Sequence, residues 1–395
     1  MKKIRNVLIM SLLSVGCNLY AQPSHGTDLY LLTCAPGTAT YSIYGHSALR
    51  IVNPENNSDL VYNWGVFDFS TPNFVWKFAK GRLEYMLGVY SFDRFLQEYF
   101  LEQRTVYQQK INLAPEEIET MLALIAENLR PENVKYRYDF FYDDCSTRIR
   151  DLLEKAAGSK LVYPPEPAKE IPTFRMKINQ YQQPFPWLQF GIDMLLGTPA
   201  DKKAGMRERM FLPIELKDGL SKALVNRDGK MIPLLQNPSL PLEFDPPGAK
   251  RNIIKMPMFI FSVSLILLIL LSTTVRGKTA NKVIDLTVFS VFSLLALLIL
   301  FFSFFTDHDQ TRWNLNIIWL SPFIILCLVS LVFNREWFVW FRLVFFLALL
   351  AFVIQIIFPN AFNTAFIPLE LMLAIRSSIR SGFSWNPLSV YLTEN

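Results

Sequence analysis

Residues 138–158 read YDFFYDDCSTRIRDLLEKAAG and place a cysteine directly after two aspartates, at the start of a run with helical periodicity. The apolar positions recur at the three- and four-residue spacing of one helix face; they are Ile149, Leu152, Leu153 and Ala156. Asp143 or Asp144 can cap the amino terminus of this helix, and Gly158 is a typical carboxy-terminal residue. The stretch therefore predicts a helix with Cys145 in its first turn.

A cysteine at this position has two interpretations. The unpaired amides and the positive dipole end of a helix amino terminus favour a thiolate, and Arg148, one turn further on, adds to the effect. Asp143 and Asp144 oppose it unless they are used as caps. The alternative is a structural role, because free cysteine is among the most buried residue types. Cys145 is therefore either a nucleophile or a small core residue.

Charge is distributed unevenly along the chain. Charged residues make up 18% of the 395 residues, below the roughly 25% that is usual for soluble proteins. The shortage lies in residues 256–375, which consist of long apolar runs, whereas residues 22–252 carry ordinary charge. This pattern predicts a soluble domain at 22–252 followed by a transmembrane domain at 253–395.

Residues 1–21 have the features of a secretory signal peptide. A basic start precedes an apolar stretch from Val7 to Val15, and Ala21 is a suitable small residue before the cleavage site. An uncleaved anchor is one alternative. Lipidation at Cys17 is another, although Ser14 fits poorly three residues before it. All three interpretations predict that the following domain is exported.

Four apolar segments are long enough to span about 30 Å of hydrocarbon: residues 256–275, 283–305, 315–333 and 337–358. A shorter fifth segment, 362–375, contains Glu370, and a carboxylate inside a span is a candidate functional residue. The alternative for this segment is a position in the membrane interface.

The basic residues near the ends of these segments predict the orientation; they are Arg276, Lys278, Lys282, Arg335, Arg376 and Arg380. When all of them are placed in the cytoplasm, residues 22–252 lie outside. The signal peptide predicts the same side, so two separate features indicate one topology.

Several classes of function lack their usual sequence features. Cys34 and Cys145 are the cysteines of the exported domain and can form a disulfide in an oxidising compartment. These residues and three histidines, His25, His46 and His308, give no metal-site spacing. The sequence contains no Gly-rich phosphate loop and no basic patch interleaved with aromatics. We therefore expect no metal, no cofactor and no nucleic-acid partner.

Residues 41–69 predict a β-hairpin, with strands at 41–52 and 60–69 and a turn at 54–58. His46 and Asn63 fall on these two neighbouring strands. Two amphipathic helices are expected to follow, at 91–98 and 115–128; the second begins with a proline and two acids, as helix amino termini prefer.

A strand histidine beside a helix-head cysteine, oriented by a polar group on the next strand, is the papain-like arrangement. Here His46 and Asn63 precede Cys145, which is a circularly permuted order. The alternative for His46 is that of a hydrogen-bonded structural residue.

Long stretches of the chain resemble the Lnb-type lipoprotein N-acyltransferases, which have a periplasmic amino-terminal domain and a carboxy-terminal transmembrane domain. These stretches are LLTCAPGTATYSIYGHSALRIV (31–52), VYNWGVFDF (61–69), FYDDCSTRIRDLL (141–153), FGIDMLLGTPAD (190–201), MFLP (210–213) and DHDQTRWNLNIIWLSP (307–322). The resemblance implies an α+β papain-like fold, circularly permuted and similar to the NlpC and lecithin–retinol acyltransferase folds, followed by an α-helical transmembrane bundle of four or five helices.

The resemblance also implies site residues. His46 in YGHSALR matches the base of the family, and Cys145 in DDCSTR matches the nucleophile. Asn63 as the third member follows from the predicted hairpin, while Asp68 and Tyr44 remain candidates. Backbone amides at the head of the Cys145 helix are the expected oxyanion donors.

The implied activity is the last step of bacterial lipoprotein maturation at the inner (cytoplasmic) membrane. In this reaction an acyl chain leaves a membrane phospholipid, forms a thioester with Cys145, and becomes an amide on the α-amino group of a diacylated lipoprotein. The expected partners are the phospholipid donor, the lipoprotein acceptor and the bilayer. The candidate substrate-binding residues are Tyr44, Arg82, Arg148 and His308, and Arg104 and Arg150 can also hold phosphate.

Each of these residues has a simpler alternative. The arginines can be surface ion-pair partners, and His308 can be an ordinary interfacial residue. For the whole protein, the rival functions are a membrane-anchored cysteine peptidase or amidase of the NlpC type that acts on the cell wall, and a non-catalytic envelope assembly protein. The membrane spans count against the first, and the second predicts that Cys145 and His46 lie apart.

Overall fold

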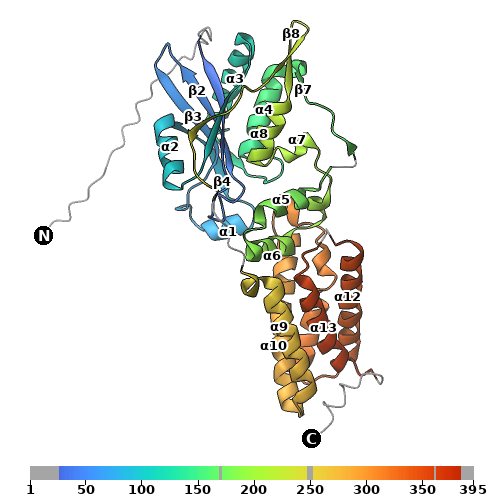
Figure 1. The fold of residues 1–395 in the computed structure, drawn as a ribbon. Helices are drawn as coiled ribbons and strands as arrows, with labels where there is room; N and C mark the ends of the chain where they lie inside the picture. Colours follow the sequence, from blue (N-terminus) through green and yellow to red (C-terminus); the bar gives the residue numbers. More distant parts are fainter. Residues whose placement is uncertain (1–25, 169–170, 247–251, 360–361, 384–395) are drawn as a thin grey trace, which may run out of the picture.

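The computed structural model describes residues 26–168, 171–246, 252–359 and 362–383. It shows a mixed α+β amino-terminal region followed by a helical carboxy-terminal region (Figure 1). The predicted signal peptide lies outside the described residues.

The α+β region is built on a seven-stranded sheet with the strand order β10-β5-β1-β2-β3-β4-β6. All six strand pairings are antiparallel. The strands are β1 (Asp28–Cys34), β2 (His46–Asn53), β3 (Ser58–Val66), β4 (Glu84–Ser91), β5 (Val106–Lys110), β6 (Lys135–Arg137) and β10 (Ser239–Leu242). A smaller sheet pairs β7 (Leu161–Val162), β8 (Leu224–Arg227) and β9 (Lys230–Pro233).

The predicted hairpin is confirmed as β2–β3, but its first strand begins at His46 and not at residue 41. Residues 41–44 form turns instead, in which the Ser42 amide donates to the Ala39 carbonyl. Gly45 then has a φ of +85°, and a Cβ there would lie 2.7 Å from the Cys34 carbonyl oxygen. Only glycine allows the chain to turn so closely into β2, and this turn places His46 at the end of the sheet.

Helices cover both faces of the sheet (Figure 1). On one face, α2 (Phe92–Leu101) packs Phe95 against Ala48 and Val61. On the other, α3 (Pro115–Asn128), α4 (Cys145–Ala157) and α8 (Pro213–Lys222) share a core with Leu49 and Trp64. The helices predicted at 91–98 and 115–128 are thus confirmed.

The helix predicted behind the two aspartates is also confirmed. Asp144 is the N-cap of α4, and its Oδ1 accepts hydrogen bonds from the amides of Ser146 (3.0 Å) and Thr147 (2.7 Å). Cys145 is the first helical residue, and Gly158 ends the helix with a φ of 57°. The predicted apolar face is buried against the sheet.

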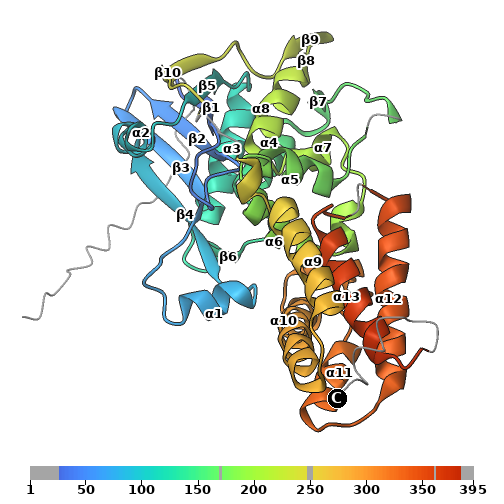
Figure 2. The same ribbon diagram turned by 60° about the horizontal axis from the view of Figure 1, so that its bottom comes forward.

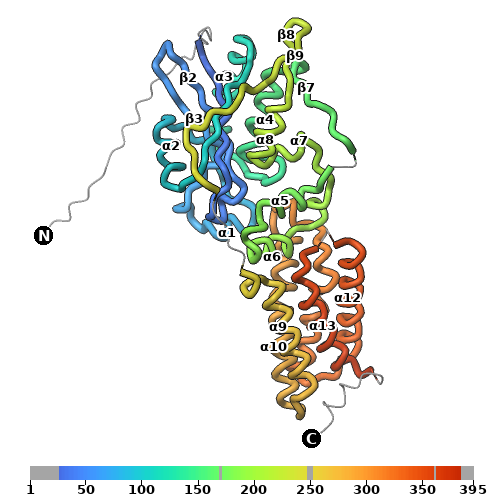
Figure 3. The backbone as a smooth tube through the Cα atoms, in the orientation of Figure 1, coloured from blue at the N-terminus to red at the C-terminus, as the bar shows by residue number. Residues whose placement is uncertain are grey.

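Short helical elements lie between these strands and helices along the chain. They are α1 (Phe74–Ala79), η1 (Gly158–Lys160), α5 (Phe174–Gln182), α6 (Pro186–Leu195), η3 (Thr198–Asp201), α7 (Met206–Arg209) and η4 (Ile253–Lys255). Figure 3 shows α5 and α6 between the two regions.

The carboxy-terminal region has three helices that are long and apolar enough to cross a membrane: α9 (Pro257–Thr274), α10 (Lys278–Phe304) and α12 (Phe338–Ile357). The predicted third span, 315–333, is not one helix. A 3-10 turn, η6 (Leu315–Ile317), is followed by α11 (Phe323–Val332), which begins directly after Pro322. A proline lacks the amide that a helix interior requires. The fifth segment forms α13 (Phe366–Arg380).

The turns that carry the basic residues predicted to be cytoplasmic lie at one end of the helical bundle. Lys282 donates to Asn334 at 2.6 Å, which brings the α9–α10 and α11–α12 turns together, and Arg342 donates to the Ser381 carbonyl after α13. The opposite end meets the α+β region (Figure 2).

This junction is formed by the loop after α10, which includes η5 (Asp309–Thr311). Asp307 pairs with Arg82 at 2.7 Å, and Gln310 donates to Asp139 at 2.6 Å. The Gly197 amide donates to the Gln310 carbonyl. A Cβ at Gly197 would lie only 1.7 Å from the Arg312 carbonyl oxygen, so this contact requires glycine.

Arg376 does not flank the bundle, as the sequence suggested. It lies inside α13, fully buried, and its Nε donates to Asp285 of α10 at 2.7 Å. Arg380 shares the same buried carboxylate at 2.5 Å. The pairing allows these charges to exist among apolar helices, where an unpaired charge is costly.

Because Asp285 is the shared partner of two arginines, Asp285→Asn should destabilise the bundle more than Arg376→Met does. Breaking a buried ion pair typically costs about 3–5 kcal/mol, whereas Arg376→Met leaves Asp285 paired with Arg380. Thermal unfolding in detergent checks this order, and an equal or reversed order would contradict it.

Candidate active site

Cys145 lies at the head of α4 against β2 and β3, and it is 6% exposed. The Ser47 amide hydrogen-bonds to its thiol, and the hydroxyls of Ser47 and Ser146 are 3.0 Å apart. Gly65 of β3 has a φ of +90°, and a Cβ there would lie 3.8 Å from Cys145 Cβ and 3.4 Å from the ring of Tyr138. The thiol is therefore held between two strands.

His46 and Asn63 are joined across the hairpin. The distance between His46 Nε2 and Asn63 Oδ1 is 2.5 Å. Because an amide oxygen only accepts, Nε2 carries the proton, and the lone pair of the ring is on Nδ1. The other candidates for the third group lie elsewhere: Asp68 accepts hydrogen bonds from Ser70, and the Tyr44 hydroxyl accepts one from Gln182.

Cys145 meets β2 one residue after His46, at the end of the sheet. The amide that reaches the thiol belongs to Ser47, the residue directly after His46. His46 is in register with Cys34, which packs on the α2 side, whereas Cys145 belongs to the core of the opposite face. Among the described residues, no hydrogen bond joins the imidazole to the thiol. Such bonds often form only when substrate is bound.

Burial raises the pKa of the Cys145 thiol, and hydrogen bonds from Ser47, Ser146 and the cysteine's own amide act against it. Burial also lowers the pKa of His46, which the hydrogen bond to Asn63 partly offsets. Burial therefore favours the thiol over the expected thiolate, and Asp144 occupies the amides of Ser146 and Thr147 at the helix head. Activation of such a thiol requires a general base, and a neutral imidazole can supply one.

Cys34 does not take part in a disulfide. Both Cys34 and Cys145 are free thiols in the structure. Burial raises the pKa of Cys34 to about 12, so its thiol is inert at neutral pH.

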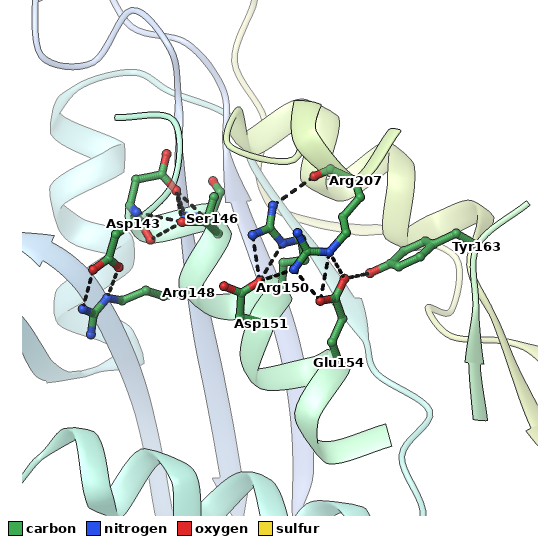
Figure 4. Close-up of polar contacts among 10 residues, drawn as sticks. Asp143, Ser146, Arg148, Arg150, Asp151, Glu154, Tyr163 and Arg207 are labelled. Atoms are coloured by element: carbon green, nitrogen blue, oxygen red, sulfur yellow. Dashed lines mark hydrogen bonds and ion pairs between the residues drawn. The ribbon is translucent and has the colours of Figure 1, made fainter. Parts of the chain in front are cut away.

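Most of the candidate arginines have protein partners. Arg148 makes two hydrogen bonds to Asp143, at 2.5 and 2.9 Å, on the outer side of α4 (Figure 4). Arg150 pairs with Asp151 and donates to the Arg207 carbonyl in the network on the other side of that helix (Figure 4). These arginines stabilise α4. Because Arg148 is paired with Asp143, it does not present an unpaired positive charge to the Cys145 thiol.

Arg104 differs from these arginines. It is 6% exposed; its Nε donates to the Ala35 carbonyl and its Nη1 to Glu102. Its Nη2 has no partner among the described residues. Arg104 also lines a cavity of about 940 Å³ near the chain that leads to α9.

The remaining candidates, Tyr44 and His308, make contacts that stabilise the fold. Tyr44 packs on Phe140 at 4.8 Å between ring centroids, and His308 donates from Nε2 to the Phe78 carbonyl at 3.0 Å. Sequence reasoning missed Ser47 and Gly65, although both stand within the quoted motifs beside His46 and Asn63. The described residues include no group of three metal-ligating side chains.

The fold and the site define a class: a membrane protein whose α+β domain carries a cysteine at the head of a helix and a hydrogen-bonded His–Asn pair on the sheet. The Lnb N-terminal periplasmic domain matches residues 22–176, and the Lnb transmembrane domain matches residues 249–384. The chain therefore belongs to the Lnb family of lipoprotein-processing membrane proteins, with a periplasmic domain ahead of a transmembrane domain. No curated protein and no solved structure matches it.

The reactivity of Cys145 should depend on the protonation of His46. Only neutral imidazole can take the thiol proton, and burial lowers the pKa of His46 from its usual value of about 6.5. The rate of Cys145 acylation by p-nitrophenyl acetate should therefore fall on acidification, with a midpoint below pH 6.5.

Asn63→Ala removes the hydrogen bond that raises the His46 pKa, so its midpoint should lie at still lower pH. The pH dependence of the initial burst of p-nitrophenol measures both values. A midpoint above pH 6.5, or one unchanged in His46→Ala, would contradict the assignment.

Proposed function

We propose that the protein is a lipoprotein N-acyltransferase that moves an acyl chain from a membrane phospholipid, through a thioester on Cys145, to the α-amino group of a diacylglyceryl-cysteine. The observation that carries the proposal is the His46–Asn63 hydrogen bond, at 2.5 Å, on the strands that border the helix-head Cys145. Membership of the Lnb family supports it.

In the first step, His46 Nδ1 takes the proton of the Cys145 thiol as sulfur attacks the ester carbonyl. The carbon–sulfur bond forms, the ester carbon–oxygen bond breaks, and the leaving glycerol oxygen takes the proton from the imidazolium. The products are an acyl-enzyme and a lysophospholipid. Asn63 keeps the proton on Nε2 and thereby keeps Nδ1 available as the base.

The tetrahedral intermediate carries a negative oxygen that needs donors. The expected donors were the amides at the helix head, but those of Ser146 and Thr147 bind Asp144. The amides of Ser47 and Cys145 contact the thiol, and we assign the oxyanion to them.

In the second step the α-amine of the lipoprotein attacks the thioester. His46 takes a proton from the attacking amine and returns it to the departing Cys145 sulfur. The carbon–nitrogen bond replaces the carbon–sulfur bond, and the starting thiol is restored. A thioester is reactive enough toward amines for this step to proceed without a further energy source.

Both substrates are lipids, and the contacts at the junction hold the α+β region against one end of the bundle. Arg82, His308 and Gln310 all bridge the two regions. A domain held in this way stays near the membrane surface, where both lipids are anchored. Arg104, which lines a cavity, is a better candidate for the donor phosphate than Arg148, which is paired with Asp143.

The proposal includes a circularly permuted papain-like fold for residues 22–252 and a multi-pass position of residues 253–395 in the inner membrane. A cell-wall peptidase of the NlpC type would use the same residues but would give the acyl group to water. The fate of the acyl-enzyme distinguishes the two functions.

Phospholipid alone should leave one acyl chain on the wild-type protein, on the peptide that contains Cys145. Neutral hydroxylamine should remove it, and a diacylated lipopeptide with a free α-amine should convert it to an amide. Cys145→Ala and His46→Ala should be stable and inactive, whereas Cys34→Ala, which changes a thiol outside the mechanism, should keep most of its activity. Mass spectrometry of peptides and lipopeptides measures each result.

Normal activity in Cys145→Ala would refute the nucleophile. Rapid release of the chain to water, with no effect of the lipopeptide, would instead indicate a hydrolase.

The topology can be tested separately at exposed positions of the two ends. A cysteine introduced at Asp93 should react with a membrane-impermeant maleimide once the outer membrane is opened. One at Lys278 should react only after the inner membrane is permeabilised, because the α9–α10 turn lies at the far end of the bundle. The unsubstituted protein is the control. The reverse pattern would separate the site from lipoproteins and refute the proposal.

A further inference from the structure

We propose that a row of aromatic side chains leading from Cys145 to α1 binds the acyl chain of the lipid donor. This aromatic row consists of Tyr138, Tyr85, Phe67, Phe74 and Phe78. The inference rests on the proposed function and assigns the binding site for the transferred chain.

The row starts at the thiol. A Cβ at Gly65 would lie within 4 Å of both Cys145 and Tyr138, so these two residues border the same small space above β3. The ring of Tyr138 is 4.5 Å from that of Tyr85, measured between centroids, and Tyr85 is 5.3 Å from Phe67. The aromatic path thus leaves the site along β3 and β4.

The row continues to α1. The centroids of Phe67 and Phe74 are 5.9 Å apart, and those of Phe74 and Phe78 are 6.4 Å apart. Phe69 lies beside the row, with its ring centroid 4.9 Å from that of Phe67. Each ring therefore touches or nearly touches the next, and together they make a continuous apolar surface.

Exposure increases along the row. The four members from Tyr138 to Phe74 are half-buried, and Phe78 is 54% exposed. Beside it, Phe69 is 69% and Val75 is 76% exposed, and α1 buries none of its six residues. A cluster of exposed large apolar side chains marks an interaction surface.

The position of α1 identifies the occupant of this surface as the bilayer. Trp76 lies 5.7 Å from Phe301 of α10, between ring centroids, and His308 binds the Phe78 carbonyl. Phe304 and Phe305 at the end of α10 are also largely exposed. The apolar surface of α1 is thus continuous with that of a helix long and apolar enough to span, and α1 projects beside α10 in Figure 2.

The anchoring of α1 is specific. Gly81 has a φ of +68°, and a Cβ there would lie 3.2 Å from the His308 ring. Lys80 bonds the Phe305 carbonyl, and Arg82 pairs with Asp307. These contacts fix the exposed end of the row at the end of α10, so a lipid chain can pass from the bilayer onto the row without crossing water.

The aromatic row predicts a dependence on chain length. Phe67→Ala and Phe74→Ala should slow acylation of Cys145 by a palmitoyl phospholipid in vesicles by about tenfold or more, because the long chain loses apolar contacts. Acylation by p-nitrophenyl butyrate, whose chain is too short to reach α1, should change less than twofold. Phe78→Ser, at an exposed position, should give the same selective loss without affecting the core.

Phe100→Ala is the matched control, because Phe100 is 58% exposed on α2 and lies outside the row. It should not change either rate. A palmitoyl donor with a photoreactive group at the far end of its chain should, after loading onto Cys145, crosslink to the peptide that contains Phe74–Ala79.

Equal losses with both donors would show a structural role for these rings and overturn the proposal, as would an unchanged rate with the palmitoyl donor. Crosslinking only to peptides outside the row would also overturn it. If the wild type accepts neither donor at Cys145, the proposed function itself fails, and the chain-binding row fails with it.

Discussion

The buried carboxylate of Asp144 is the constraint on which the site depends. It caps α4 through two amides and so fixes Cys145 as the first residue of that helix, between β2 and β3. Burial of the helix head raises the pKa of the Cys145 thiol. The cap thus positions the sulfur while burial favours its protonated form, and in the proposed mechanism the His46–Asn63 pair supplies the base that a protonated sulfur requires.

The second constraint is the junction between the two regions. It is polar and densely bonded: Asn316 donates to the Met194 carbonyl, Asn363 to Asp193, and Arg175 pairs with both Asp193 and Asp201. Buried hydrogen-bonded networks of this kind specify one arrangement of their parts. An exported domain attached by a flexible linker alone would sample many distances from the membrane surface. This domain has a defined orientation relative to the helical bundle.

Local patterns predicted local structure well. The cap, the first turn and the end of α4, the bounds of α3 and the pairing of His46 with Asn63 all follow from residues close together in the sequence. Two of the predictions that failed depend on contacts between residues far apart in the sequence. The pKa of Cys145 depends on burial by strands nearly a hundred residues earlier in the chain. Arg376 was predicted to flank a membrane segment because its partner, Asp285, lies on another helix. Arg148 was a candidate substrate-binding residue, but it is paired with Asp143. The sequence allowed this ion pair but did not require it.

The short helix α11 has a consequence for the surrounding membrane. Its ten residues are about 15 Å long, roughly half the thickness of the hydrocarbon layer. The non-helical residues before it, Trp319 and Leu320, are fully buried among other helices, as backbone at that depth requires. Hydrophobic mismatch of this size thins the adjacent leaflet or tilts its lipids. The working rate of the protein would then vary with bilayer thickness, and with the lipid composition that sets it, even when donor and acceptor concentrations are constant.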